Sequence, residues 1–171
     1  MNADDLAAAV LAICESRGVK IACAESLTGG LLADAFVRIP GASRVFLGSA
    51  VTYDINAKAS ILGVDKALLD REGAVHPEVA RQMAVATARL YDQPEYAGRV
   101  IGLSTTGVAG PGPDGDKPAG LVYVGFHIPR DVAADRAEHV EAVELRLSGT
   151  REDVRHATVL HVLERLRAWL G

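Results

Sequence analysis

Apolar residues recur along this chain in two periodicities, which predict helices and strands that alternate. Intervals of three and four residues predict amphipathic helices, and these cover residues 4–17, 31–39, 77–90 and about 150–170. Short apolar runs predict strands at 19–24, 45–53, 99–105 and 121–128, and alternation with Glu144 and Arg146 predicts a half-exposed strand at 143–147. Two shorter helical segments, 54–62 and 65–71, follow the second strand.

This order of elements is typical of an α/β domain in which helices cover both faces of a mostly parallel sheet. The two consecutive strands near the C-terminal end can pair antiparallel, so we expect a three-layer α/β/α sandwich with a mixed, mostly parallel sheet. A chain of 171 residues without repeats or linkers is expected to form a single domain, 1–171.

Composition narrows the classes of partner. The net charge of −4 gives no general electrostatic reason to bind nucleic acid or an anionic membrane surface. No apolar run approaches the ~20 residues that span a bilayer, and the N-terminus is acidic, so we expect a cytoplasmic protein. Cys14 and Cys23 are expected to be buried thiols, and the five histidines have no metal-binding spacing, so no metal or cofactor is expected. The high apolar content leaves a homo-oligomer possible.

One stretch, residues 22–30, places a hydroxyl where the first strand ends and the second helix begins. There Ser26 is followed by Thr28, Gly29 and Gly30. Free backbone N–H groups collect at such a junction, so Ser26 is either a nucleophile beside an oxyanion site or an ordinary helix cap. Spacing alone favours the cap.

A second segment supplies groups that can activate a serine. Tyr53 and Lys58 follow the second strand, whose carboxyl end should lie beside that of the first. A buried lysine with a lowered pKa can accept the serine proton. The alternatives are a solvated Lys58 and a Tyr53 that only packs. Glu25 can orient Lys58 or be exposed, and Asn56 can cap a helix or contact substrate.

A glycine- and proline-rich loop, 107–118, follows the third strand. It lacks the ending of a P-loop, but Thr106, Gly107, Gly110 and Lys117 can present donors to a polar ligand, unless the loop is a plain connection. At the start of the last helix, Arg151 and Arg155 lie four residues apart and can hold a phosphate or form surface ion pairs.

Together these segments resemble a known family. The resemblance is carried by Ala-Glu-Ser-x-Thr-Gly-Gly at 24–30, Val-Thr-Tyr-x-x-x-Ala-Lys at 51–58, a looser match beginning at Gly73, Thr-Gly-Val-Ala-Gly-Pro at 106–111, Lys-Pro-x-Gly at 117–120 and Ser-Gly-Thr-Arg-Glu-x-Val-Arg at 148–155. The sequence is similar to the C-terminal domain of the competence/damage-inducible CinA proteins, a domain that also occurs alone as nicotinamide-nucleotide amidase.

The resemblance implies an anticodon-binding-domain-like fold and hydrolysis of nicotinamide mononucleotide to nicotinate mononucleotide and ammonia, in pyridine-nucleotide recycling. The family's serine, tyrosine and lysine map onto Ser26, Tyr53 and Lys58. The chain departs from many relatives at Leu27, where they have cysteine, and in the 112–116 part of the loop.

The mechanism expected on this basis begins with attack by Ser26 while neutral Lys58 takes its proton. Tyr53 would relay that proton or hold Lys58, and Glu25 is a weaker candidate for orienting the lysine. The N–H groups of Thr28, Gly29 and Gly30 would bind the oxyanion. The loop, Lys117 or Arg151 would bind the phosphate. The alternative from another class is a non-catalytic nucleotide-binding module, in which Ser26 is only a cap.

Overall fold

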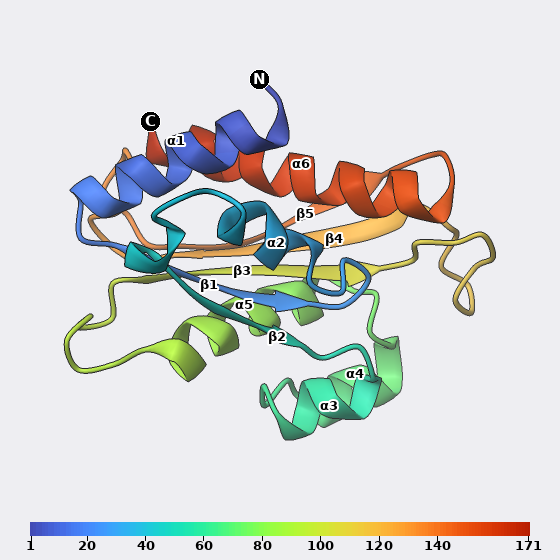
Figure 1. The fold of residues 1–171 in the computed structure, drawn as a ribbon. Helices are drawn as coiled ribbons and strands as arrows, with labels where there is room; N and C mark the ends of the chain where they lie inside the picture. Colours follow the sequence, from blue (N-terminus) through green and yellow to red (C-terminus); the bar gives the residue numbers. More distant parts are fainter.

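A five-stranded sheet divides the computed structural model, which describes all 171 residues, into two helical layers (Figure 1). The strands are β1 (Lys20–Glu25), β2 (Phe46–Val51), β3 (Val100–Gly107), β4 (Leu121–Ile128) and β5 (His139–Arg146). Their order across the sheet is β2-β1-β3-β4-β5. β1 pairs parallel with both β2 and β3, whereas the β3–β4 and β4–β5 pairs are antiparallel. The expected mixed sheet is therefore confirmed.

Seven helical segments connect and cover the strands: α1 (Ala3–Ser16), α2 (Leu31–Val37), the 3₁₀ turn η1 (Ala42–Arg44), α3 (Ile55–Ser60), α4 (Lys66–Glu72), α5 (Pro77–Tyr91) and α6 (Arg151–Leu170). α1, α2 and α6 cover one face of the sheet and α5 lies across the other, with α3 and α4 beyond the end of β2 (Figure 1). This is the predicted three-layer α/β/α arrangement.

The main core lies between the sheet and the α1–α2–α6 layer. It is a cluster of 29 buried residues, to which β1, β3 and β4 contribute alternate side chains such as Ile21, Leu103 and Phe126. A smaller cluster under α4 and α5 includes Ala24, Leu69 and Met83. Because residues of β1 reach both clusters, the strand is fixed from both faces, and so is the segment that follows it.

Two glycines allow α5 to lie close against the sheet. A Cβ at Gly102 of β3 would be 1.9 Å from the Ala84 carbonyl oxygen, and one at Gly125 of β4 would be 2.2 Å from that of Ala80. The hydroxyl of Ser104 donates to the same Ala80 carbonyl at 2.6 Å. The helix therefore packs backbone against backbone, which explains glycine at two central sheet positions.

The predicted elements differ from the observed ones chiefly at β5. The alternation predicts a strand at 143–147, but β5 begins four residues earlier, at His139. Its first half has exposed Val140 and partly exposed His139 and Glu141, so it lacks the apolar-in, polar-out signal. Pairing with the whole length of β4, rather than burial, extends the strand.

Candidate active site

Ser26 lies immediately after β1, where the chain turns away from the sheet toward α2. Its N–H donates to the Thr105 carbonyl of β3 at 3.0 Å, which holds the serine at the end of the parallel pair. Gly29 and Gly30 have positive φ angles of 52° and 104°, a conformation that favours glycine. Ser26 is 8% exposed, so the residue is buried except for a small accessible part.

Lys58 reaches Ser26 from the last turn of α3. Its Nζ lies 3.1 Å from Ser26 Oγ and donates to the Thr52 carbonyl at 2.5 Å. The side chain is 1% exposed and has no carboxylate partner within salt-bridge distance. The predicted proximity of Ser26 and Lys58 is confirmed, and the alternative of a solvated surface lysine is wrong.

Burial lowers the pKa of Lys58 from its usual 10.5 to about 8, against a smaller opposing effect from the charge of Asp54. An ammonium group loses its hydration here and gains only neutral acceptors, so the charged form is disfavoured. About a tenth of the lysine is then neutral at pH 7 and can accept a proton from the serine hydroxyl.

Glu25 does not orient Lys58, and it is not exposed; both expectations for this residue are wrong. Its carboxylate is fully buried beneath the start of α2. It accepts hydrogen bonds from the hydroxyls of Thr28 and Ser49, each at 2.7 Å, and from the N–H groups of Gly30, Leu32 and Ala33. Five donors satisfy the charge without a cation, so Glu25 holds the turn that presents Ser26.

The backbone donors near Ser26 differ from those expected. The N–H of Gly29 is bound to the Ser26 carbonyl and that of Gly30 to Glu25, so neither is free to bind an oxyanion. By contrast, the N–H groups of Leu27 and Thr28 have no acceptor within the protein, although both residues are buried. Backbone N–H groups of buried residues are nearly always paired, and these two unpaired donors directly follow the serine.

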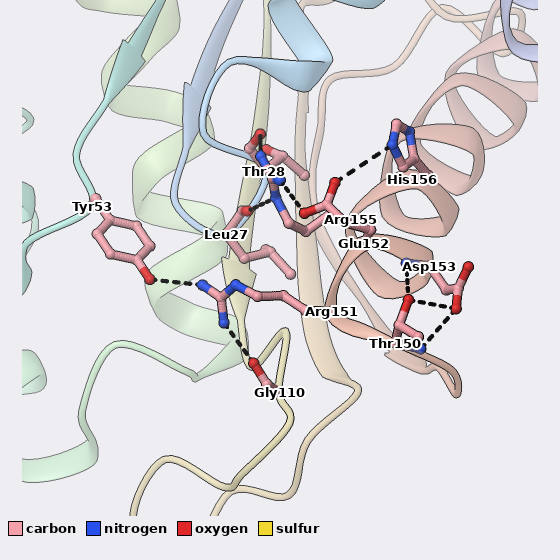
Figure 2. A network of polar contacts seen from close by, with 10 residues as sticks. All are labelled: Leu27, Thr28, Tyr53, Gly110, Thr150, Arg151, Glu152, Asp153, Arg155 and His156. Carbon is pink, nitrogen blue, oxygen red and sulfur yellow. Dashed lines mark hydrogen bonds and ion pairs between the residues drawn. The ribbon is translucent and has the colours of Figure 1, made fainter.

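Tyr53 lies apart from the serine–lysine pair. Its side chain is 63% exposed and makes no hydrogen bond to Ser26 or Lys58. Its hydroxyl instead accepts from Arg151 Nη2 at 3.0 Å, and Arg151 Nη1 donates to the Gly110 carbonyl at 2.6 Å (Figure 2). The structure therefore does not support the expected proton relay or support of Lys58. Tyr53 joins the β2–α3 connection to α6 and the glycine-rich loop.

The remaining candidate residues are placed as follows. Asn56 is exposed and makes no side-chain hydrogen bond, so it does not cap α3. Thr106 donates to the Ala74 carbonyl at 2.8 Å and is buried. Gly107 packs so closely against β4 that a Cβ there would lie 2.5 Å from the Leu121 carbonyl oxygen. Lys117 pairs with Asp114 through its backbone, and its side chain forms no salt bridge. Of these, Asn56 and Lys117 have side chains available to a ligand.

The start of α6 is already occupied by its own acidic residue. Thr150 and Asp153 form a reciprocal capping box, and the Thr150 hydroxyl lowers the pKa of the Asp153 carboxyl by donating to it. Arg155 binds the carbonyls of Leu27 and Thr28 and the carboxylate of Glu152 (Figure 2). Arg155 is therefore fully engaged within the protein, and an anion at the N–H groups that begin α6 would face the carboxylates of Glu152 and Asp153.

Two threonines contact the Ser26–Lys58 pair in ways that the sequence does not predict. Thr52 contributes its carbonyl to Lys58, a backbone contact that any residue could make, and its buried hydroxyl has no partner. Thr105 contributes a hydroxyl that lies 3.3 Å from the Ser26 N–H and 2.8 Å from the Thr28 hydroxyl. The strand register, with Thr105 opposite Glu25, explains why this hydroxyl reaches the Ser26 turn.

Outside this site, Cys14 and Cys23 are free and buried, as expected, and burial raises the pKa of both thiols. No group of three or more His, Cys, Asp or Glu side chains is placed to hold a metal ion. None of the helices has both the length and the apolar character needed to cross a bilayer.

The protein is thus a three-layer α/β domain that holds a serine against a buried lysine at the carboxyl end of its parallel strands. The comparison with family models then gives the family: residues 3–170 match the CinA C-terminal domain, and the chain belongs to that family.

Curated relatives and solved structures agree with this assignment. The chain is 44% identical over 162 residues to a putative competence-damage inducible protein of Caldanaerobacter subterraneus subsp. tengcongensis, covering 94% of this chain and 36% of that protein. It is 41% identical over 169 residues to a CinA-like protein of Frankia casuarinae, covering 98% and 36%. The chain thus spans about a third of the length of these relatives. The crystal structure of competence/damage inducible protein CihA from Agrobacterium tumefaciens matches with a TM-score of 0.87 and 32% identity, over 100% of this chain and 97% of that one.

Proposed function

We propose that this chain is a serine amidase that hydrolyses the carboxamide of nicotinamide mononucleotide to nicotinate mononucleotide and ammonia. The observation that carries the proposal is the 3.1 Å contact between Ser26 Oγ and the Nζ of a buried lysine whose pKa is lowered to about 8. A serine hydroxyl is a weak nucleophile unless a base accepts its proton, and the contact with Lys58 supports this lysine as the base. The choice of substrate rests on the resemblance of the motifs to the amidase members of the family.

The first step forms a bond between Ser26 Oγ and the amide carbon while the hydroxyl proton passes to neutral Lys58. The carbonyl oxygen becomes an oxyanion, for which the free N–H groups of Leu27 and Thr28 are the available donors. Protonated Lys58 then gives the proton to the departing nitrogen, the C–N bond breaks and ammonia leaves. Water, deprotonated by Lys58, hydrolyses the resulting acyl-enzyme.

Around this centre, Arg151 and Lys117 are the cations we assign to the nucleotide phosphate. Arg151 lies between Tyr53 and the glycine-rich loop, and Lys117 has no carboxylate partner. Tyr53 then acts on the reaction only through Arg151. Removing its hydroxyl, as in Tyr53→Phe, is expected to raise the KM for the mononucleotide and to leave kcat within a few-fold of wild type.

The direct test is ammonia release from nicotinamide mononucleotide by wild type, Ser26→Ala and Lys58→Met. Both variants should lose at least about 10³-fold in kcat, since neither half of the pair acts without the other. For the wild type, log kcat/KM should rise with pH and level off above about pH 8, where Lys58 is neutral. Variants that release ammonia at the wild-type rate would refute the mechanism. Saturable binding of the mononucleotide without turnover would instead identify a nucleotide-binding module.

A further inference from the structure

The two free N–H groups after Ser26 belong to peptide units whose carbonyls are both engaged. The Leu27 N–H shares its peptide plane with the Ser26 carbonyl, which accepts from the Gly29 N–H at 3.1 Å. The Thr28 N–H shares its plane with the Leu27 carbonyl, which accepts from Arg155 Nε at 2.8 Å. In a trans peptide the N–H points opposite to the C=O, so a bond that fixes the carbonyl also fixes the direction of the donor.

Arg155 is the group that reaches this segment from another layer of the fold. It lies on the second turn of α6, more than 120 residues away in the chain, and its guanidinium also donates to the Thr28 carbonyl at 3.1 Å (Figure 2). Its side chain is 22% exposed, and its outer nitrogen pairs with Glu152. No other side chain donates to the carbonyls of residues 26–28.

We propose that Arg155 is a positioning residue that orients and polarises the oxyanion donors beside Ser26. A charged donor on the Leu27 carbonyl withdraws electron density from that peptide and strengthens its N–H as a donor, because hydrogen bonds in a chain reinforce one another. The fixed positive charge also lies on the side of the peptide units away from the developing negative charge. The inference rests on the proposed function in that the site must stabilise an oxyanion, but it does not depend on which amide is the substrate.

The competing role is a purely structural one, in which Arg155 only ties α6 to the β1–α2 turn. Both roles predict some loss of stability when the guanidinium is removed. They differ in the chemistry at Ser26: a positioning residue changes the rate at which Ser26 reacts in the folded protein, whereas a structural tie changes the unfolding midpoint alone.

The test measures the folded protein in two reactions. One is ammonia release from nicotinamide mononucleotide, resolved into kcat and KM. The other is labelling of Ser26 by an alkyl fluorophosphonate, in which Ser26 Oγ bonds to phosphorus, fluoride leaves and Lys58 takes the proton. The phosphoryl oxygen of that probe needs the same N–H donors but no nucleotide contacts. Ser26→Ala is the blank, and all rates are taken well below each variant's unfolding midpoint.

Arg155→Met is expected to lower kcat and the labelling rate by about 10–100-fold, somewhat less than the ~10²–10³ typical of deleting an oxyanion donor outright. KM should stay within about three-fold, and the pH profile should still level off above about pH 8, because Lys58 is untouched. Arg155→Lys, which keeps a charged donor, should recover part of the loss and serves if Arg155→Met does not fold. Glu152→Gln removes the outer ion pair of Arg155 and leaves its carbonyl bonds, so it is the matched control and should label at the wild-type rate.

The outcomes separate this inference from the proposed function. If Arg155→Met and Arg155→Lys label and turn over like wild type, the positioning role is wrong whatever the substrate is. If the wild type releases no ammonia from the mononucleotide but Ser26 is labelled in an Arg155-dependent way, the inference stands and the proposed substrate is wrong. An equal loss in Glu152→Gln and Arg155→Met would also refute the positioning role, since only one of them breaks the carbonyl bonds.

Discussion

Burial of Lys58 should make the stability of the fold depend on pH in a way that a single substitution removes. The native pKa is about 8 and the unfolded value is the usual 10.5, so the unfolded chain binds this proton more tightly between those values. The free energy of unfolding therefore rises as pH increases through this window. Below pH 8 the buried ammonium costs about 3 kcal/mol, at roughly 1.4 kcal/mol per pH unit. Most of this cost, about 2–3 kcal/mol, is recovered between pH 7 and pH 10.

Lys58→Met keeps the unbranched side chain and removes the titrating group. Two effects oppose each other at pH 7: the variant avoids the charge penalty, but it leaves the Thr52 carbonyl without its donor, at a cost of about 1–3 kcal/mol. At pH 10 most of the penalty is gone from the wild type and only the lost hydrogen bond remains. Relative to wild type, the variant should therefore become less stable by about 2–3 kcal/mol between pH 7 and pH 10.

Urea unfolding of both proteins at pH 7, 8, 9 and 10 measures this difference directly. The other titrating groups, including the two buried thiols, are common to both proteins and cancel. Lys66→Met removes an exposed lysine from the neighbouring α4, and its curve should run parallel to that of wild type. Parallel curves for Lys58→Met and wild type would show that Lys58 keeps an ordinary pKa, and the argument for a neutral base near pH 7 would fail with it.

Two further substitutions test the packing that holds the site. Glu25→Gln places an amide N–H₂ among five donors, and we expect about 3 kcal/mol of destabilisation by urea unfolding, with a smaller effect refuting the role of the charge. Gly102→Ala places a Cβ 1.9 Å from the Ala84 carbonyl oxygen and should destabilise the protein by about 3 kcal/mol, because α5 must move away from the sheet. The control Gly112→Ala, where a Cβ meets no atom within 4 Å, should change stability by less than about 0.5 kcal/mol. Equal effects of the two substitutions would contradict the close approach of α5.

The sequence was sufficient to predict the layers and the meeting of Ser26 with Lys58. Apolar periodicity identifies the strands, and two parallel neighbours must end at the same edge of the sheet, so groups that follow β1 and β2 lie together. The prediction fails where a contact depends on side-chain direction across a long separation. The hydroxyl of Tyr53 accepts a hydrogen bond from Arg151, 98 residues further along the chain. Neither periodicity nor spacing predicts which cation an exposed tyrosine contacts.

Glu25 shows a different limit of sequence reasoning. A carboxylate at a strand end next to a candidate nucleophile is usually exposed or functional, because burying an unpaired charge is costly. What makes burial tolerable is a set of five donors, three of them backbone N–H groups of the following turn, which exist only once that turn has formed. The residue is therefore predictable only together with the conformation that it stabilises.

Nearly all backbone polar groups around Ser26 are hydrogen-bonded, so the few that are not are informative. Every N–H from Ser26 to Asp34 has an acceptor except those of Leu27 and Thr28, and the carbonyls of residues 26–28 are all bound. Glu25 holds the segment through its N–H groups and Arg155 through its carbonyls, from opposite directions. In a segment restrained this thoroughly, two unpaired N–H groups beside a buried lysine are not what stability alone favours. The unpaired donors directly follow Ser26, and the buried lysine contacts its hydroxyl at 3.1 Å, so both exceptions support the proposal that Ser26 is the nucleophile.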